Sequence, residues 1–151
     1  MAPIIRAATV EDLKAVKAID EALFGEDTYP LFVLRQLLDI TSSFFKVALL
    51  ENKVVGYAIG HYHSEAKQAW FLSLGVLQEY GGQGIGEKLT KALLEGVEAK
   101  GGRESYLTVH PENKRGISIY KKLGFVEQKY VPDYYGDGVP RLIMVRTSAS
   151  K

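Results

Sequence analysis

The chain of 151 residues contains no cysteine, which excludes disulfide bonds, thiolate metal sites and a cysteine nucleophile. Charge of one sign is also scarce, because 19 lysine and arginine residues nearly balance 18 aspartate and glutamate residues. A net charge of +1 argues against nucleic acid as an obligatory partner. No apolar run approaches the roughly 20 residues that cross a bilayer, and residues 1–6 lack a signal peptide's apolar core. We therefore expect a soluble, cytoplasmic protein with no membrane partner.

The length is typical of one domain, and 46% hydrophobic residues are enough to form its core. We assign residues 1–151 to a single domain and expect residues 147–151 to be a frayed tail. Hydrophobic periodicity predicts the order β-α-α-β-β-β-α-β-α-β-β. The predicted strands are 4–7, 44–50, 54–61, 68–77, 104–110, 125–134 and 139–146. The predicted helices are 10–23, 31–40, 84–100 and 113–123.

A glycine-rich segment, Y-G-G-Q-G-I-G over residues 80–86, joins a predicted strand to a predicted helix. Glycine allows positive φ and a close approach of the backbone to a ligand, and the first turn of a helix attracts anions. A P-loop is excluded because Glu87 follows Gly86, and neither Gly82 nor Gly84 begins a dinucleotide fingerprint. The pattern predicts a different phosphate cradle, with an ordinary glycine-rich turn as the alternative.

A second informative segment, N-K-R-G-I-S-I-Y-K-K-L-G-F, covers residues 113–125. Asn113 is a favourable N-cap, and Ile117, Tyr120 and Leu123 fall on one face of the helix that it would begin. Gly124 is well placed to end that helix before the next strand. Taken alone, Tyr120 is more often a core aromatic residue than a functional one.

Both segments resemble motifs of the GNAT acetyltransferase superfamily. Residues 81–86 resemble its pyrophosphate loop, Q/R-x-x-G-x-G/A, with Gly81 where glutamine or arginine is usual. Residues 113–125 resemble N-x-x-A-I-x-x-Y-x-x-x-G-F, with Gly116 in place of alanine. The closing region around Tyr134 and Tyr135 is similar to RimI-like N-terminal acetyltransferases. The resemblance implies an α/β fold, a mixed twisted sheet with helices on both faces, in which the strands before the last two helices splay apart.

The resemblance also implies an N-acetyltransferase that uses acetyl-CoA as co-substrate and transfers the acetyl group to a primary amine by direct attack in a ternary complex. Tyr120 is the implied general acid, and a tyrosine holds its proton at neutral pH. The implied substrate-binding residues are Phe24, Tyr29, Tyr134 and Tyr135. The implied cofactor-binding residues are Leu74, Gly75, Val76, Gly82, Gln83, Gly84, Ile85, Gly86, Glu87, Asn113 and Tyr120. Within this set, Gly75 suits a β-bulge or a close approach, or is simply a small residue under a helix.

The general base is the position at which the chain departs most from the family. Thr108 stands where family members carry glutamate or histidine, and threonine is no base near neutral pH. His110, two residues further on, is one catalytic candidate, and Glu65 or a chain of waters is another. A third alternative needs no strong base, because an α-amine has a pKa of about 7.7–8.0 against about 10.4 for lysine.

The missing base therefore favours the N-terminal α-amine of a peptide or protein as the acceptor. A small amine such as a polyamine, an amino acid or an antibiotic is the first alternative. A module that binds acetyl-CoA without catalysis is the second, because Gly81 and Thr108 both depart from the family pattern. An open slot between residues 24–30 and 134–138 would indicate a peptide substrate, and a closed acidic pocket a small amine. A homodimer is left open, and no metal is expected, since His61 and His63 lack carboxylate ligands at a suitable spacing.

Overall fold

The computed structural model describes residues 2–148, which contain a seven-stranded sheet in the order β1-β2-β3-β4-β5-β7-β6. Neighbouring strands are antiparallel, apart from the parallel pair β4 and β5. The strands are β1 Ile4–Ala7, β2 Phe45–Leu50, β3 Lys53–His63, β4 Gln68–Val76, β5 Glu104–Val109, β6 Val126–Val131 and β7 Arg141–Thr147. The mixed sheet confirms the predicted fold class.

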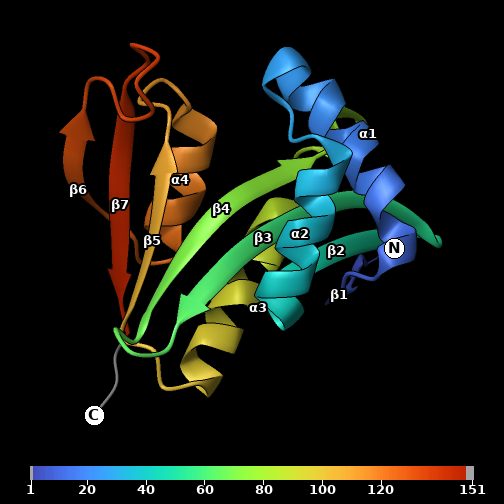
Figure 1. Ribbon diagram of the computed structural model, residues 1–151, viewed down its shortest axis with the longest axis horizontal. Coiled ribbons are helices and arrows are strands. Elements are labelled where there is room, and N and C mark those ends of the chain that lie inside the picture. Colours follow the sequence, from blue (N-terminus) through green and yellow to red (C-terminus); the bar gives the residue numbers. More distant parts are fainter. Residues whose placement is uncertain (1, 149–151) are drawn as a thin grey trace.

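Helices cover both faces of this sheet (Figure 1). The helices are α1 Leu13–Phe24, α2 Leu31–Thr41, α3 Ile85–Ala99 and α4 Lys114–Lys122. On one face, α1 and α2 pack over β2, β3 and β4, and on the other face α3 packs over the same strands. Helix α4 lies on the α3 side, where its apolar residues join a cluster with β5 and β7. No helix among residues 2–148 combines the length and the apolar character that crossing a membrane requires.

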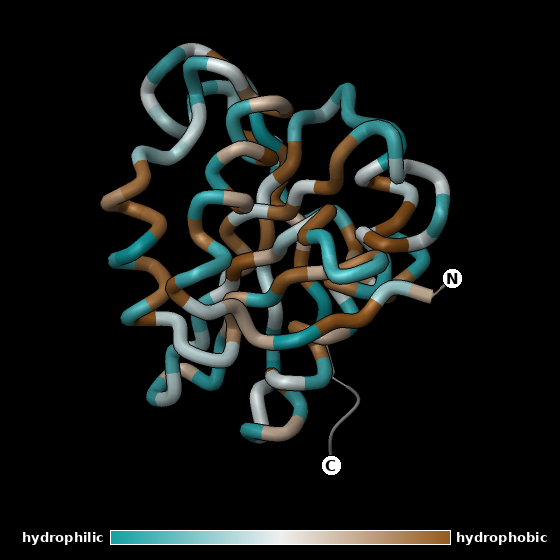
Figure 2. The backbone as a smooth tube through the Cα atoms, turned by 90° about the vertical axis from the view of Figure 1, so that its right-hand side faces the viewer, coloured by the Kyte–Doolittle hydropathy of each residue, from teal (hydrophilic) through white to brown (hydrophobic). Residues whose placement is uncertain are grey.

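The apolar stripes that predicted the helices form these buried layers. Val16 and Ile19 of α1 are buried against β2 and β3, whereas Ile85, Leu89 and Leu93 of α3 are buried on the opposite face. Figure 2 shows hydrophobic residues recurring along the helices and strands, while the connecting loops at the periphery are mostly hydrophilic or neutral. Burial of a fully covered side chain of this kind contributes about 1.5–3 kcal/mol, so the two layers fix the sheet between them.

The ends of several elements follow local capping chemistry. Asp12 accepts hydrogen bonds from the N–H and hydroxyl groups of Thr9 at the start of the first helical segment. The Arg6 guanidinium, 2.7 Å from the same carboxylate, holds the pKa of Asp12 below its usual range. A short 3₁₀ turn over Val10–Asp12 precedes α1 itself. Gly124, at a φ of 99°, ends α4 as predicted.

Two predicted boundaries at the C-terminal end are wrong. Strand β6 ends at Val131 rather than at residue 134, because residues 132–138 form a turn in which the Asp133 carboxylate accepts the Gly138 N–H. Thr147 belongs to β7, and the Ser148 N–H donates to the Arg103 carbonyl at 2.7 Å, so these residues are not frayed. The remainder of the predicted tail, residues 149–151, lies outside the described residues.

Strands β4 and β5 separate as the resemblance implied. Their parallel pairing extends only from Gln68 opposite Glu104 to Phe71 opposite Leu107, although both strands continue (Figure 1). The β-bulge of β4 lies at the point of separation, since Ile59 pairs with Ser73 and Gly60 with Phe71, which leaves Leu72 without a partner. The separation opens the centre of the sheet.

The bulge expected at Gly75 is therefore elsewhere. Gly75 pairs in regular register with Tyr57. A Cβ at this position would stand 2.7 Å from the Tyr57 ring and 2.8 Å from Leu23 of α1. Glycine is needed here because a helix and an aromatic ring pack directly on the strand. Of the alternatives offered by the sequence, Gly75 is therefore the small residue under a helix.

Candidate active site

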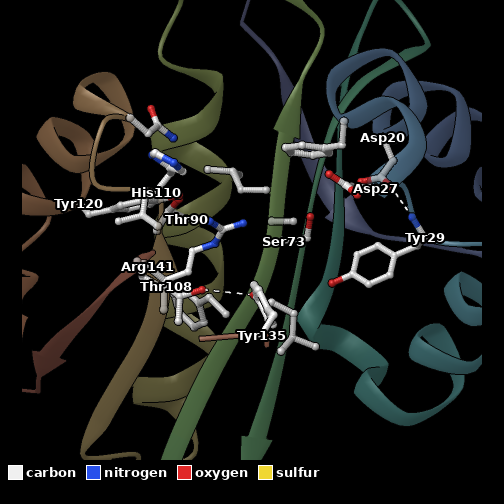
Figure 3. Close-up of a pocket in the computed structure, with 18 of the residues that line it drawn as sticks. Asp20, Asp27, Tyr29, Ser73, Thr90, Thr108, His110, Tyr120, Tyr135 and Arg141 are labelled. Carbon is white, nitrogen blue, oxygen red and sulfur yellow. Dashed lines mark hydrogen bonds between the residues drawn. The ribbon is translucent and has the colours of Figure 1, made fainter. Parts of the chain in front are cut away.

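A cavity of about 520 Å³ opens where β4 and β5 separate. Its walls come from both splayed strands, from the α1–α2 segment, from the closing turn and from helices α3 and α4 (Figure 3). The polar or aromatic residues that line it are Asp20, Phe24, Asp27, Tyr29, Phe71, Ser73, Thr90, Thr108, His110, Asn113, Tyr120, Tyr135, Asp137 and Arg141. The cavity thus brings together residues from nearly the whole chain.

The glycine-rich loop lies at the start of α3, and the helix itself reaches the cavity through Thr90 and Leu93. Gly82 and Gly84 have φ values of 78° and 79°, a region that other residues rarely adopt, and Gly84 occupies the N-cap position of α3. The first N–H groups of a helix lack partners within it and attract anions. The loop residues from Gly82 to Glu87 do not line the cavity itself and lead into the first turn of α3.

Asn113 caps α4 in the way the sequence predicted. Its Oδ1 accepts the Gly116 N–H at 3.0 Å, and the residue also lines the cavity. A Cβ at position 116 would stand only 2.8 Å from Asn113 Nδ2, so glycine replaces the usual alanine where the cap folds over the first turn. The one side chain both begins the helix and borders the cavity.

Tyr120 projects from α4 to the same cavity (Figure 3). Its ring meets Phe125 edge-on with centroids 5.9 Å apart. Burial raises the pKa of Tyr120 to about 12. The phenol therefore keeps its proton throughout the neutral pH range and can donate it within the cavity.

The histidine candidate for the base already uses one of its ring nitrogens. His110 lines the cavity just after β5, and its Nδ1 accepts the Glu112 N–H at 3.1 Å. In a neutral imidazole with Nδ1 as acceptor, the proton resides on Nε2, so no free lone pair remains to take another. Thr108 Oγ1 lies 3.4 Å from Tyr135 Oη, and Glu65 lies in the turn before β4, at the end remote from the cavity.

A buried carboxylate that the sequence analysis missed organises the other end of the cavity. Asp20 is 1% exposed and accepts hydrogen bonds from the hydroxyls of Thr28 and Tyr57 and, at 2.8 Å, from the Tyr29 N–H. The Tyr57 hydroxyl also lies 3.0 Å from Ser73 Oγ. Burial, followed by the hydrogen bond to Asp20, raises the pKa of Tyr57 above its ordinary value. The sequence feature that could have revealed this site is an aspartate within the apolar stripe of α1.

Three of the aromatic residues implied to shape the substrate slot reach the cavity, namely Phe24, Tyr29 and Tyr135. Burial is the main cause of the raised pKa of Tyr29. Tyr134 does not line the cavity but packs edge-on against Tyr135, with ring centroids 5.0 Å apart. Arg141, which the sequence analysis did not single out, places its guanidinium 5.3 Å from the Tyr135 ring centroid.

Of the implied β4 residues, only Leu74 lines the cavity, whereas Gly75 and Val76 do not. Within residues 2–148, no cluster of three or more histidine, aspartate or glutamate side chains is arranged to hold a metal ion.

Comparison with known proteins agrees with this arrangement. A curated N-alpha-acetyltransferase from Sulfurisphaera tokodaii is 30% identical, over 93% of this chain and 90% of the relative. N-alpha-acetyltransferase 30 from Schizosaccharomyces pombe is 30% identical over 74% of this chain and 77% of its own length. The crystal structure of Ard1 from Thermoplasma volcanium superposes with a TM-score of 0.91, at 27% identity, and covers 99% of this chain and 100% of that one.

The family model described as acetyltransferase (GNAT) family matches residues 13–125, which include α1, the glycine-rich loop and α4. The matched part of the chain carries the glycine-rich loop and the splayed strands described above. This chain therefore belongs to the GNAT acetyltransferase family and is an acetyl-CoA-dependent N-acetyltransferase.

Proposed function

We propose that this enzyme acetylates the N-terminal α-amine of a peptide or protein. The observation that carries the proposal is the position of the cavity between the α1–α2 segment and the closing turn. Phe24 and Tyr29 line it from one side, and Tyr135 and Asp137 from the other, so a chain end can enter between these two segments. The relatives named N-alpha-acetyltransferase support the same acceptor.

Acetyl-CoA supplies the activated acetyl thioester. In our proposal the backbone N–H groups of residues 82–87 hold its phosphates, and Asn113 borders its pantetheine arm. Beyond Phe71 the backbone of β4 is no longer paired with β5, so it is available to this arm through Leu74 and the residues that follow. Tyr120 Oη, protonated at neutral pH, is the proton donor for the departing sulfur.

The acceptor end of the cavity is acidic. Asp27 and Asp137 line it together with the buried Asp20, and Arg141 is the cation among them. These carboxylates attract an ammonium group, and the amine must then lose a proton before it attacks. Because the N-terminal α-amine has a pKa of only about 7.7–8.0, a substantial fraction is already neutral near pH 7.5 without a strong base. The absence of a base at Thr108 is thereby compatible with this acceptor.

The test measures thiol released from acetyl-CoA with three acceptors. The first is a peptide with a free N-terminus and no lysine, the second has a blocked N-terminus and one internal lysine, and the third is a polyamine. We expect turnover with the first alone. The acidic cavity favours a small cationic amine as the second candidate function, and turnover with the polyamine alone would establish it. Silence with all three, while acetyl-CoA still binds, would contradict the proposal and favour a non-catalytic module.

The proposal also includes a single domain over residues 1–151, a cytoplasmic location and a RimI-like choice of protein substrate, and it leaves open whether the chain forms a homodimer. Cell fractionation tests the location, and light scattering tests the homodimer. A panel of peptides that begin with different residues tests the substrate choice, for which activity on alanine-initiated ribosomal peptides is the expected result.

A further inference from the structure

The first position of the glycine-rich loop, Gly81, lies beside the side chain of Arg115. Gly81 has a φ of −68° and a ψ of 156°, which any residue adopts without strain. A Cβ built at this position would stand 3.5 Å from Arg115 Nη1, and one at Gly82 would stand 3.4 Å from Arg115 Nη2. The nearest atom to the Cβ at position 81 is the Gln78 carbonyl oxygen at 3.2 Å, and the guanidinium of Arg115 lies next to it, in van der Waals contact with the positions of both glycines.

Arg115 is the second residue of α4 and is exposed. None of the ion pairs among the described residues includes it. Another cation near this loop is already paired, since Lys122 Nζ lies 3.1 Å from the Glu87 carboxylate. Arg115 of α4 thus places a guanidinium group, outside every ion pair of the described residues, beside the glycine-rich loop that precedes α3.

We propose that Arg115 takes over the role of the side chain missing at Gly81 and binds the pyrophosphate of CoA. Guanidinium groups bind phosphate oxygens through two parallel hydrogen bonds, which a lysine at the same place does not reproduce. Because the guanidinium lies against the first two loop glycines, it faces the same anion as the loop N–H groups. The inference rests on the loop as the phosphate site and is independent of which amine accepts the acetyl group.

Titration calorimetry of the whole protein with CoA tests the assignment. We expect Arg115→Gln to weaken binding by about tenfold or more, because charge-assisted bonds to phosphate are lost. Dephospho-CoA, which keeps the pyrophosphate but lacks the 3′-phosphate, should show the same loss. Lys114→Gln removes one charge from the same end of α4, from a side chain that is not among the nearest neighbours of Gly81, and should change affinity by less than about twofold. Unchanged CoA affinity in Arg115→Gln would overturn the proposal, as would a loss confined to CoA.

A second variant separates the contact from any effect on folding. In the Arg115→Gln background, Gly81→Arg returns a guanidinium to the loop, at a backbone conformation that any residue adopts, provided that the Gln78 carbonyl 3.2 Å from the new Cβ shifts by a few tenths of an ångström. We expect this double variant to recover most of the lost affinity for both CoA and dephospho-CoA. A double variant that binds as weakly as Arg115→Gln would contradict the idea that the two positions serve one phosphate contact.

Discussion

At the scale of single residues, Tyr120 gives the sharpest prediction. Its hydroxyl reaches the cavity, and burial raises its pKa to about 12, so it is a protonated donor at every pH used for assay. Tyr120→Phe should lower kcat by about 10²–10⁴-fold, the usual contribution of general acid catalysis. Steady-state kinetics at saturating acetyl-CoA measure the effect. Tyr130→Phe on the exposed β6 is the matched control, and equal kcat in both variants would remove Tyr120 from the mechanism.

Asp20 carries a second prediction at this scale, about stability. Its carboxylate is buried and accepts from Thr28, Tyr29 and Tyr57, so Asp20→Asn forces an amide group against donors that need an acceptor. We expect a loss of about 1–3 kcal/mol in the free energy of unfolding, measured by urea denaturation. Asp39→Asn is the control, because its ion pair with Arg35 is exposed and contributes less than about 1 kcal/mol. Similar losses in both variants would show that the Asp20 network is not needed for stability.

At the scale of elements, alanine substitution at two glycines should change the stability of the protein in opposite directions, because Gly75 of β4 is crowded by its neighbours and Gly86 of α3 is not. Gly75→Ala places a methyl group 2.7 Å from Tyr57 and should destabilise the protein by about 1–3 kcal/mol through overpacking. Gly86→Ala in α3 places its methyl group 3.8 Å from the nearest atom, in the Leu74 side chain of β4, and should stabilise the protein by up to about 1 kcal/mol through helix propensity. Thermal unfolding compares the two. A stable Gly75→Ala variant would mean that α1 does not press on the strand.

Local patterns predicted the elements well, and long-range pairing explains what they missed. The stripe of Ile85, Leu89 and Leu93 marks one face of α3 by its own spacing, and the structure confirms it. The bulge lies at Leu72, away from Gly75, because register depends on the pairing of β3 with β4, which no local composition determines. Strand β6 stops at Val131 because the following turn closes on Asp133.

At the scale of the whole molecule, the site was predictable where its residues are contiguous in the sequence. Gly82 and Gly84 have the positive φ that the loop pattern predicted, and Asn113 caps the helix that carries Tyr120. Arg115 could not be assigned from the sequence, since its place beside the loop depends on how α4 packs relative to α3. A contact between segments that are distant in the chain produces no motif with a fixed spacing in the sequence.

The pH dependence of the whole reaction follows from which groups titrate. For a peptide with a free N-terminus, kcat/KM should rise about tenfold per pH unit and level off near pH 7.7–8.0, where the α-amine loses its proton. It should not fall again by pH 10, because the pKa of Tyr120 near 12 keeps the proton donor in its acid form. His110→Ala should leave this profile unchanged, since Nδ1 already accepts the Glu112 N–H. A slower or differently shaped pH profile in His110→Ala would instead identify His110 as the general base.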